Sequence, residues 1–412
     1  MEINWQEFYA RRTRQITGSQ IRQFFALTER PEIISFAGGF PASDFFPREE
    51  IGRVLGELAC AENSHALQYA PTEGNHDLRA YLAAKIRCAG SACHIDNIII
   101  TNGSQQGLDL LCRILVNPGD PVLVEEPAYV GGMGAIKSYG GVPAGIPMDG
   151  EGPLPAAMEK TILKLERQGR HPRLFYTVTN FHNPTGYTTS LARRKAILAL
   201  AEDYNIVIIE DNPYGELCYE GTVPPNYQAL DRSGRVIYLG SYSKIFIPGI
   251  RIGWMAAPQA VIEKVCLAKQ TADLCSNSLG QRLAYRLSAE GFIDRHVKKL
   301  ICFYRKNRDA MLETMERCFP PEINFTRPQG GFFVWVQFPP FYPPARELLH
   351  LALEQGVAFV HGEGFFSGAG GSHAARFSFS QVSPEKIAAG ISRLGKLFYR
   401  FREEDTRQAA GE

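Results

Sequence analysis

From about residue 97, short apolar runs alternate with longer amphipathic stretches, and this alternation narrows the folds open to the chain. Runs of four residues rich in isoleucine, valine and leucine are typical of buried strands. One intervening stretch, residues 190–203, begins with Ser190, a residue type that commonly caps helices. Apolar strands that alternate with helices predict a mostly parallel sheet covered by helices on both faces. The expected strands are residues 98–101, 122–125, 174–177, 206–209 and 236–239.

Past about residue 290 the pattern changes to a long charged helix followed by short strands. With 412 residues the chain is long for a single core, so more than one domain is expected. The expected elements here are helices near 292–316 and 344–355 and strands at 331–336, 357–360 and 376–379. We therefore predict three parts, which are an N-terminal arm and helix (1–45) that contributes to the small domain and the substrate pocket, a large domain (46–290) and a small α+β domain (291–412).

Charge and hydropathy argue against several kinds of partner. Lys and Arg number 44 against 43 Asp and Glu, for a net charge of +1, and no long basic run is present. We therefore expect no nucleic-acid partner. No apolar stretch approaches the ~18 residues of a membrane span, so no membrane partner is expected. The N-terminus lacks the apolar core of a signal peptide, and Glu2 and Glu7 argue against a transit peptide, which predicts a cytoplasmic protein.

The nine cysteines are scattered, and no Cys-x-x-Cys spacing occurs. Cys88, Cys93 and His94 are close in sequence but have no second pair to complete a tetrahedral zinc site. We interpret them as structural residues in a reducing compartment and expect no metal.

Polar segments follow the expected strands, at the edge where parallel sheets bind ligands. Residues 103–107 (Gly-Ser-Gln-Gln-Gly) stand between a strand and a helix, where backbone N–H groups can hold an anion. Tyr129 follows the next strand, and Asn183 opens a Pro- and Gly-containing turn after another. Asp211 ends an apolar strand, which is costly unless a cation meets it. Each has an ordinary alternative, such as a turn, a packed aromatic wall or a salt bridge.

The segment 241–254 (SYSKIFIPGIRIGW) adds two hydroxyls, Lys244 and Arg251 at the end of the strand 236–239. An amine that can form a Schiff base, among groups that can hold a phosphate dianion, suits pyridoxal 5′-phosphate (PLP). Taken alone, such a segment is more often an ordinary surface lysine after a strand. The other strand-end residues argue for the cofactor.

Asn183, Asp211, Lys244 and Arg251 follow one another at intervals of 28, 33 and 7 residues, with Tyr214, Ser241 and Ser243 between them. This pattern resembles the class I/II PLP-dependent aminotransferases, and the branch that looks most similar contains the 2-aminoadipate and kynurenine aminotransferases. The similarity extends from residues 19–22 and 34–41 to 376–380. It implies an α/β fold of type I, with a mostly parallel sheet sandwiched by helices and a smaller α+β C-terminal domain.

The resemblance also implies roles for individual residues. Lys244 would form the Schiff base with PLP and move the Cα proton, while Asp211 keeps the pyridine nitrogen protonated. Asn183 and Tyr214 would bind the ring oxygen, and Tyr129 would stack on the ring as the third catalytic residue. The residues implied at the phosphate are Ser104, Gln105, Ser241, Ser243 and Arg251.

Further residues are implied for the substrate and for a partner subunit. Arg376 would bind the substrate α-carboxylate, near Asn183 and Gly39. Tyr69 matches a tyrosine that reaches the phosphate of the neighbouring subunit, which implies a homodimer with shared active sites. Arg22 would either pair with a distal carboxylate or only cap its own helix.

The pocket around Arg22 is expected to be mostly apolar because of nearby phenylalanines, Phe36 and Phe40 among them. Neither His182 nor the glycine-rich loop 364–371 indicates which substrate binds.

Transamination between an L-amino acid and a 2-oxo acid is the first interpretation, because a pinned carboxylate would turn the Cα–H bond toward Lys244. We expect aminoadipate, aromatic or aliphatic donors and 2-oxoglutarate as acceptor. A racemase or a β-eliminating lyase on the same scaffold is the alternative enzyme, since both also remove the Cα proton. A PLP-sensing regulator is a third class. Such regulators carry a DNA-binding domain ahead of the similar region, and a match that begins by residue 19 leaves no room for one.

Overall fold

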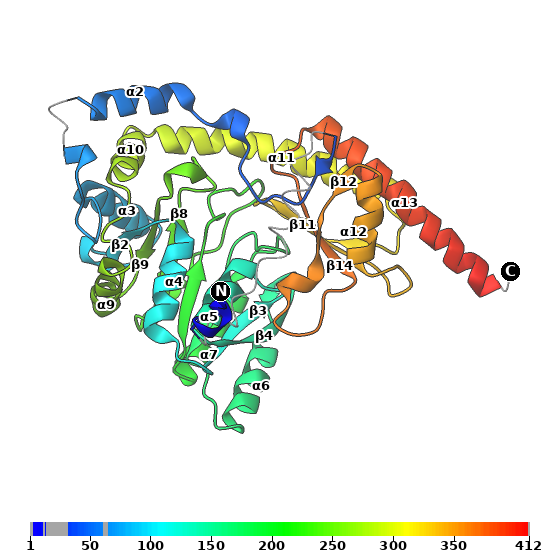
Figure 1. The fold of residues 1–412 in the computed structure, drawn as a ribbon, viewed down its shortest axis with the longest axis horizontal. Coiled ribbons are helices and arrows are strands. Elements are labelled where there is room, and N and C mark those ends of the chain that lie inside the picture. Colours follow the sequence, from blue (N-terminus) through cyan, green and yellow to red (C-terminus); the bar gives the residue numbers. More distant parts are fainter. Residues whose placement is uncertain (1–2, 11–12, 14–31, 61–64, 411–412) are drawn as a thin grey trace.

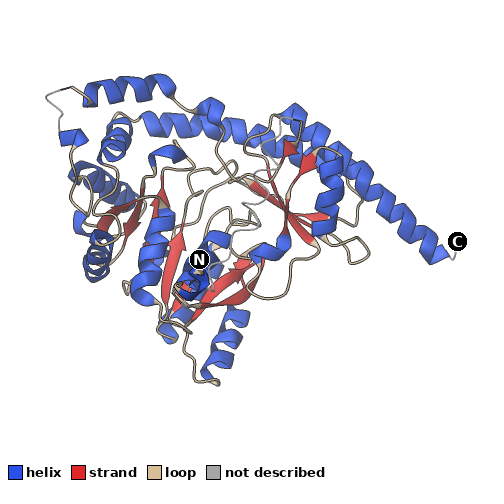
Figure 2. Cartoon of the chain, in the orientation of Figure 1, coloured by secondary structure: helices blue, strands red, loops and turns tan. Residues whose placement is uncertain are grey.

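Residues 3–10, 13, 32–60 and 65–410 are described in the computed structural model of the protein, and of 404–410 only the backbone. Two sheets organise the chain, a large one built between residues 98 and 256 and a smaller one between residues 324 and 378 (Figures 1 and 2). Helices pack around the large sheet, and the long helix α11 runs from beside α10 to the smaller sheet (Figure 1). Within the described part of the chain, no helix combines the length and the apolar character that crossing a membrane requires.

The large sheet has eight strands in the order β2-β9-β8-β7-β6-β3-β4-β5. The five central strands β3, β4, β6, β7 and β8 are parallel, whereas β9 is antiparallel to β8 and β2, and β5 is antiparallel to β4. The strands are β2 (Ile98–Thr101), β3 (Pro121–Glu126), β4 (Val142–Asp149), β5 (Gly152–Pro153), β6 (Leu174–Val178), β7 (Val207–Asp211), β8 (Val236–Ser241) and β9 (Gly253–Ala256).

Side chains alternate between two cores, one on each face of the large sheet. Leu123, Phe175 and Ile208 pack with residues of α6 and α7 in one core, and their neighbours Val124 and Ile209 belong to the main core on the other face. This alternation decides which strand-end residues share a face. The helices are α2 (Arg48–Leu58), α3 (His76–Cys88), α4 (Ser104–Leu115), α5 (Val130–Ser138), α6 (Pro155–Glu166), α7 (Leu191–Asp203), α8 (Tyr227–Leu230), α9 (Gln259–Gln270) and α10 (Ser278–Ala289).

The smaller sheet is antiparallel, in the order β10-β11-β14-β13, and α11 and α13 pack against each other beside it. A short parallel pair, β1 with β12, ties the N-terminal segment to this region. The elements are β1 (Ile34–Ser35), α11 (Phe292–Cys318), β10 (Asn324–Phe325), β11 (Phe333–Gln337), α12 (Ala345–Glu354), β12 (Val357–Ala358), β13 (Val360–His361), β14 (Ala374–Ser378) and α13 (Pro384–Ala410). Short 3₁₀ turns are η1 (Trp5–Glu7), η3 (Ser43–Phe45), η5 (Ile95–Asn97), η6 (Pro248–Ile250) and η7 (Gly362–Phe365).

The five strands expected in the large sheet are all present, and Ser190 caps α7 by accepting a hydrogen bond from the backbone N–H of Arg193. Two expectations were incomplete. The run 357–360 is two strands in different sheets, because β12 pairs with β1 and β13 pairs with β14. The strands β4 and β9 were missed: β4 contains two prolines and is half exposed, and β9 follows directly on the lysine segment.

Candidate active site

Lys244 lies in the turn after β8, at the carboxyl edge of the parallel strands. Its Nζ donates a hydrogen bond to the carbonyl oxygen of Gly39 at 2.8 Å. Burial, with help from the Arg376 and Arg251 guanidinium groups, lowers the pKa of Lys244 to about 8, and Asp211 opposes this shift. An amine with this pKa gives up its proton near neutral pH, as a nucleophile or general base must.

Asp211 ends β7 beside this lysine and lies in the core. One carboxylate oxygen, Oδ2, accepts a hydrogen bond from the Tyr176 hydroxyl at 2.9 Å. The other, Oδ1, is buried without a hydrogen-bond partner among the described residues. Burial raises the pKa of Asp211 to about 7, while the Tyr176 hydrogen bond and Lys244 act against the rise. A buried acceptor without a hydrogen-bond partner costs free energy, so this oxygen is suited to a ligand that donates an N–H.

Arg376 comes from β14 of the smaller sheet and meets residues of the large sheet. Its Nη1 donates to Asn183 Oδ1 at 2.9 Å, and its Nη2 donates to the carbonyl oxygen of Ala37 at 2.7 Å. The guanidinium carbon lies 4.4 Å from the ring centre of Phe333 and 5.2 Å from that of Phe365. Stacking and hydrogen bonding together hold the group in one orientation.

The buried Arg376 still has capacity for an anion. Burial lowers the pKa of Arg376 to about 10, so it stays charged at neutral pH. Its Nε is buried without a partner in the described part of the chain, and a guanidinium has five N–H groups in all. Gly39 contributes space, because a Cβ there would lie 2.7 Å from Cζ of Phe333. A planar carboxylate is the anion that such a fork recognises best.

A backbone cradle lies at the start of α4. Gly103 has φ of 78°, a conformation that favours glycine, and Ser104 begins the helix. Gly253 packs so closely that a Cβ on it would lie 2.7 Å from the Ser104 backbone nitrogen. A Cβ on Gly103 would lie 2.6 Å from Nη2 of Arg251. The first N–H groups of a helix have no intrahelical partner, so this cradle can bind an anion.

Arg251 extends the cradle. It adopts a left-handed backbone conformation, with φ of 54°, immediately after η6. Its guanidinium donates to Ser243 Oγ at 3.4 Å and to the Asn102 carbonyl oxygen at 3.3 Å. Ser241 Oγ accepts a hydrogen bond from the Ser243 backbone N–H at 3.0 Å. A chain of hydrogen bonds therefore links the two expected serines and the arginine.

Two tyrosines lie beside these groups. Tyr129 precedes α5, and its hydroxyl donates to Gln105 Oε1 at 3.4 Å. A Cβ on Gly131 would lie 2.5 Å from Cζ of Tyr129, so glycine makes room for the ring. Tyr214 is buried, its ring lies 5.9 Å below Nζ of Lys244, and burial raises the pKa of its phenol. The side chain of Asn183 partly offsets that rise.

His182 is a structural residue of the Asn183 turn. Its ring is buried, with Nε2 3.0 Å from Glu125 Oε2 and Nδ1 2.9 Å from Thr185 Oγ1. Glu125 also accepts hydrogen bonds from the Thr177 hydroxyl and the Val178 backbone N–H. Because strand side chains alternate, Glu125 faces away from the side on which Asp211 lies.

The glycine-rich loop 364–371 connects the two sheets. Ser367 donates two hydrogen bonds to Glu126 Oε1, at 2.9 Å from its backbone N–H and 2.6 Å from its hydroxyl. The Ala128 backbone N–H donates to the Phe365 carbonyl oxygen at 2.7 Å. The loop thereby holds the Phe365 ring against Arg376.

Four of the expected residues are not seen at this place. Arg22 lies outside the described residues. Tyr69 is 78% exposed, so the structure of one chain leaves it at the surface. Phe36 was expected to line the pocket, but it is fully buried against Phe377 in the core, and Phe40 is exposed.

The residues that sequence reasoning missed are Tyr176, Phe333 and Phe365. The aromatic residues of the expected strand at 331–336 were the only signal for Phe333, and Tyr176 stands inside an apolar strand without any signal.

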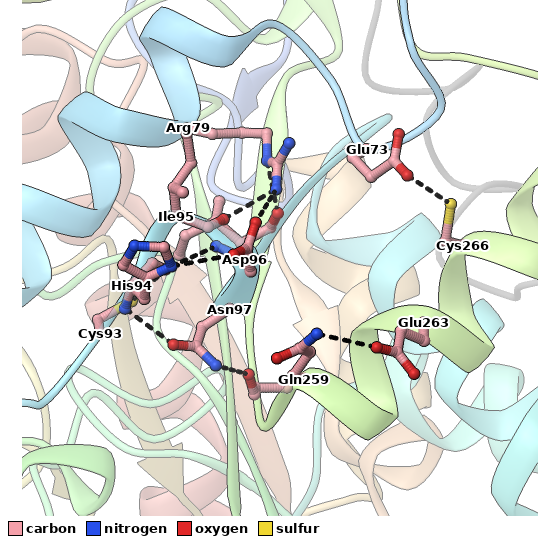
Figure 3. A network of polar contacts seen from close by, with 12 residues as sticks. Glu73, Arg79, Cys93, His94, Ile95, Asp96, Asn97, Gln259, Glu263 and Cys266 are labelled. Atoms are coloured by element: carbon pink, nitrogen blue, oxygen red, sulfur yellow. Dashed lines mark hydrogen bonds and ion pairs between the residues drawn. The ribbon is translucent and has the colours of Figure 1, made fainter.

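Cys93 and His94 lie in a network that holds the edge strand β2 (Figure 3). His94 Nδ1 lies 3.0 Å from Asp96 Oδ2, and the His94 side chain caps η5. Arg79 donates to the carbonyl oxygens of Ile95 and Ile98 at 2.9 Å each. Burial raises the pKa of Cys93 to about 11, which makes its thiol unreactive. Among the residues that the structure describes, no cluster of three or more metal-ligating side chains is found.

A family model matches most of the chain. The model for aminotransferases of class I and II covers residues 43–394. The chain belongs to this family. The aminotransferase shares 40% identity over 396 residues with an aromatic-amino-acid aminotransferase of Thermococcus litoralis, covering 96% of this chain and 94% of that one.

Two solved structures share both the fold and the sequence pattern of this aminotransferase. The kynurenine aminotransferase of Pyrococcus horikoshii, solved with PMP, is 38% identical with a TM-score of 0.92 over 97% of this chain and 98% of that one. The α-aminoadipate aminotransferase of Thermus thermophilus, complexed with N-(5′-phosphopyridoxyl)-L-leucine, is 36% identical with a TM-score of 0.89 over 97% and 100% of the two chains. The cofactor of this aminotransferase is PLP.

The residues present fit that cofactor at three points. The unpartnered Oδ1 of Asp211 suits a protonated ring nitrogen. The cradle at Gly103, which a Cβ would fill, suits a phosphate. Lys244, with its pKa lowered to about 8, suits the aldehyde carbon.

Proposed function

We propose that this aminotransferase moves the amino group of an aminoadipate, aromatic or aliphatic L-amino acid to a 2-oxo acid such as 2-oxoglutarate. One observation carries the proposal: Arg376 and Lys244 both donate hydrogen bonds to the backbone of the same short segment, Arg376 to Ala37 and Lys244 to Gly39. An amino acid whose carboxylate pairs with Arg376 would bring its Cα close to the Lys244 amine. The names of the relatives from Thermococcus, Pyrococcus and Thermus support the donor classes.

We assign the cofactor contacts as follows. Lys244 would bind PLP covalently, Asp211 would pair with its ring nitrogen, and Tyr129 would cover the ring face. Asn183 and Tyr214 would bind the ring oxygen. The phosphate is held by the cradle and its neighbours, which are Ser104, Gln105, Ser241, Ser243 and Arg251. When bound, PLP acts as an electron sink for the bond that breaks at the substrate Cα.

The chain's own groups then control one proton. Arg376 fixes the carboxylate, with Asn183 and the space at Gly39 setting its position. The Lys244 amine, released when the substrate amine takes its place, would accept and hold the proton removed from the substrate Cα. Its lowered pKa makes the neutral amine available near neutral pH. Phe333 and Phe365 cover the guanidinium and exclude water from the ion pair.

A racemase or β-lyase would begin with the same proton transfer, so product analysis distinguishes the reactions. Transamination gives one 2-oxo acid and one new amino acid in equal amounts. Racemisation gives only the mirror-image amino acid, and β-elimination releases ammonia.

We propose that the enzyme acts as a homodimer with shared sites. A second chain would cover three large side chains that are exposed in one chain, namely Tyr69 (78% exposed), Leu67 (65%) and Leu274 (50%). In the shared arrangement, Tyr69 reaches the partner's cofactor phosphate.

The experiment for the substrate is a screen of twenty amino donors against 2-oxoglutarate, pyruvate and glyoxylate. Arg22→Ala tests the distal carboxylate. Loss of a charge-assisted contact costs about 1.5–3 kcal/mol, so kcat/KM with aminoadipate or glutamate should fall roughly ten- to a hundredfold and stay nearly constant with leucine. Equal losses with both donors would leave Arg22 a structural residue. Production of racemised donor without any 2-oxo acid would refute transamination.

A further inference from the structure

Tyr176 is buried in β6 and reaches Asp211 across two parallel strands. In the register, Tyr176 lies opposite Ile209 and Val178 lies opposite Asp211. Because side chains alternate along a strand, Tyr176 and Asp211 emerge on the same face of the sheet, as diagonal neighbours. The Tyr176 side chain is long enough to span the diagonal, and its hydroxyl donates to Asp211 Oδ2 at 2.9 Å.

The fold makes specific room for this ring. Gly132 in α5 faces it, and a Cβ on Gly132 would lie 2.3 Å from Cε1 of Tyr176. The neighbouring Gly131 makes the same allowance for Tyr129. The first turn of α5 is thus free of side chains where two aromatic rings pass beneath it.

The hydrogen bond occupies only one of the two carboxylate oxygens of Asp211. Oδ2 has the Tyr176 hydroxyl as a partner, and Oδ1 is buried without one among the described residues. A carboxylate held through one oxygen is restrained from rotating about its Cβ–Cγ bond, so the direction of its other oxygen is restrained as well.

We propose that Tyr176 is a positioning residue for PLP, which holds the Asp211 carboxylate so that its free oxygen receives the ring N–H of the cofactor. This inference rests on the role proposed above for Asp211, and it predicts that Tyr176 acts on cofactor binding through the ring nitrogen alone.

The electrostatics favour the same role. Burial raises the pKa of Asp211 to about 7 and Glu125 adds to the rise, whereas the Tyr176 hydrogen bond and Lys244 lower it. Removing the hydroxyl would leave more of Asp211 protonated near neutral pH, and a protonated carboxyl is a weaker partner for a pyridinium N–H. Burial raises the pKa of Tyr176 well above its ordinary value, so the phenol remains a donor.

The test is a comparison of two ligands on two apoenzymes. Wild type and Tyr176→Phe are each titrated with PLP and with its 1-deaza analogue, which carries C–H in place of the ring nitrogen, and bound cofactor is followed by absorbance. PLP should bind roughly ten- to a hundredfold more weakly to Tyr176→Phe, as expected for a lost hydrogen bond to a charged group. The analogue should bind both proteins equally well.

Tyr227→Phe is the matched control. Tyr227 is a fully buried tyrosine whose hydroxyl has no hydrogen-bond partner in the described residues, and it packs in the core on the other face of the sheet. This variant should bind PLP like wild type. A second variant, Gly132→Ala, keeps the hydroxyl but displaces the ring, and it should also lose more affinity for PLP than for the analogue.

The outcomes distinguish the role of Tyr176 from the role of Asp211. Equal weakening of PLP and analogue by Tyr176→Phe, or no weakening of either, would overturn the inference and leave Asp211 in its role. Wild type that binds PLP no better than the analogue would refute the role of Asp211 itself, and the inference with it.

Discussion

The two ends of the proposed PLP site differ in burial and in the groups they offer. The ring-nitrogen end, made of Asp211 and Tyr176, is buried at 3% and 1% exposure and consists of strand side chains in a fixed register. The phosphate end, made of Gly103, Ser104, Ser243 and Arg251, lies on turns and a helix start, and Arg251 is exposed. A neutral or singly charged ring can be enclosed by the core, whereas a phosphate dianion is held with less desolvation near the surface.

This difference predicts different responses to mutation, pH and salt at the two ends. A buried carboxylate couples cofactor binding to the stability of the fold. An exposed cation such as Arg251 couples cofactor binding to ionic strength. Lys244 stands between the ends and is required by both.

The largest effect is expected for Lys244→Ala. Loss of the covalent anchor and of the base at Cα should lower kcat by about 10⁴-fold or more, since general acid–base catalysis alone is worth roughly 10²–10⁴. Lys264→Ala, an exposed lysine on α9, is the control and should keep full activity. Borohydride reduction of the yellow wild-type enzyme should attach the pyridoxyl group to Lys244. A label on any other lysine would contradict the assignment.

The ring-nitrogen end should show a pH-dependent stability of the apoenzyme. The pKa of Asp211 is about 7 in the folded protein, against an ordinary aspartate value of 3.8. Between these values the folded state keeps a proton that the unfolded state has released, so stability falls as pH rises from about 4 to 7. Asp211→Asn removes this contribution. The difference in unfolding free energy between wild type and Asp211→Asn should therefore change by up to about 1.4 kcal/mol per pH unit.

Urea unfolding of both apoproteins at pH 5, 6, 7 and 8 measures that difference. Arg251→Gln, a change at the phosphate end, should follow the wild-type slope because arginine does not titrate in this range. Parallel curves for wild type and Asp211→Asn would mean that Asp211 is not buried as an isolated carboxyl.

The phosphate end should respond to salt. Arg251→Gln should weaken PLP binding roughly ten- to a hundredfold at low ionic strength, as for a lost charge-assisted contact. Exposed charges are screened over about 10 Å at 0.1 M salt. The ratio of the PLP dissociation constants of Arg251→Gln and wild type should therefore shrink as the potassium chloride concentration is raised. Arg167→Gln, an exposed arginine after α6, should have no effect. A ratio that is independent of salt would place Arg251 in a buried contact instead.

The sequence predicted most of the site because its residues follow apolar strands, and the carboxyl ends of parallel strands meet at one edge. Lys244, Asp211, Asn183 and Arg251 were located in this way. Tyr176 could not be found, since a tyrosine within an apolar run is indistinguishable from an ordinary core residue until the register with β7 is known.

The contacts between the two sheets could not be predicted from the sequence either. The rings of Phe333 and Phe365 meet Arg376 only because β11, η7 and β14 fold together. Phe36 was expected among the phenylalanines of the apolar pocket, but it is fully buried against Phe377, because the sequence does not say which way a side chain turns. The division of the chain at residues 45 and 290 remains a prediction.

The smallest effect is expected for Tyr69→Phe, and it tests whether the phosphate end is completed by a second chain. Solvent at the exposed phosphate end screens the hydrogen bond from the uncharged Tyr69 phenol to the phosphate, so its contribution should stay near the ordinary value of about 0.5–1.5 kcal/mol, and PLP should bind roughly two- to tenfold more weakly. The decisive measurement mixes Tyr69→Phe with an excess of Lys244→Ala, denatured and refolded together. In a shared-site dimer, the sites that retain Lys244 then receive Tyr69 from the inactive partner, so their PLP affinity should return to the wild-type value. An affinity unchanged by mixing, or an active monomer in sedimentation, would contradict the shared site, and the 78% exposure of Tyr69 would then be that of an ordinary surface residue.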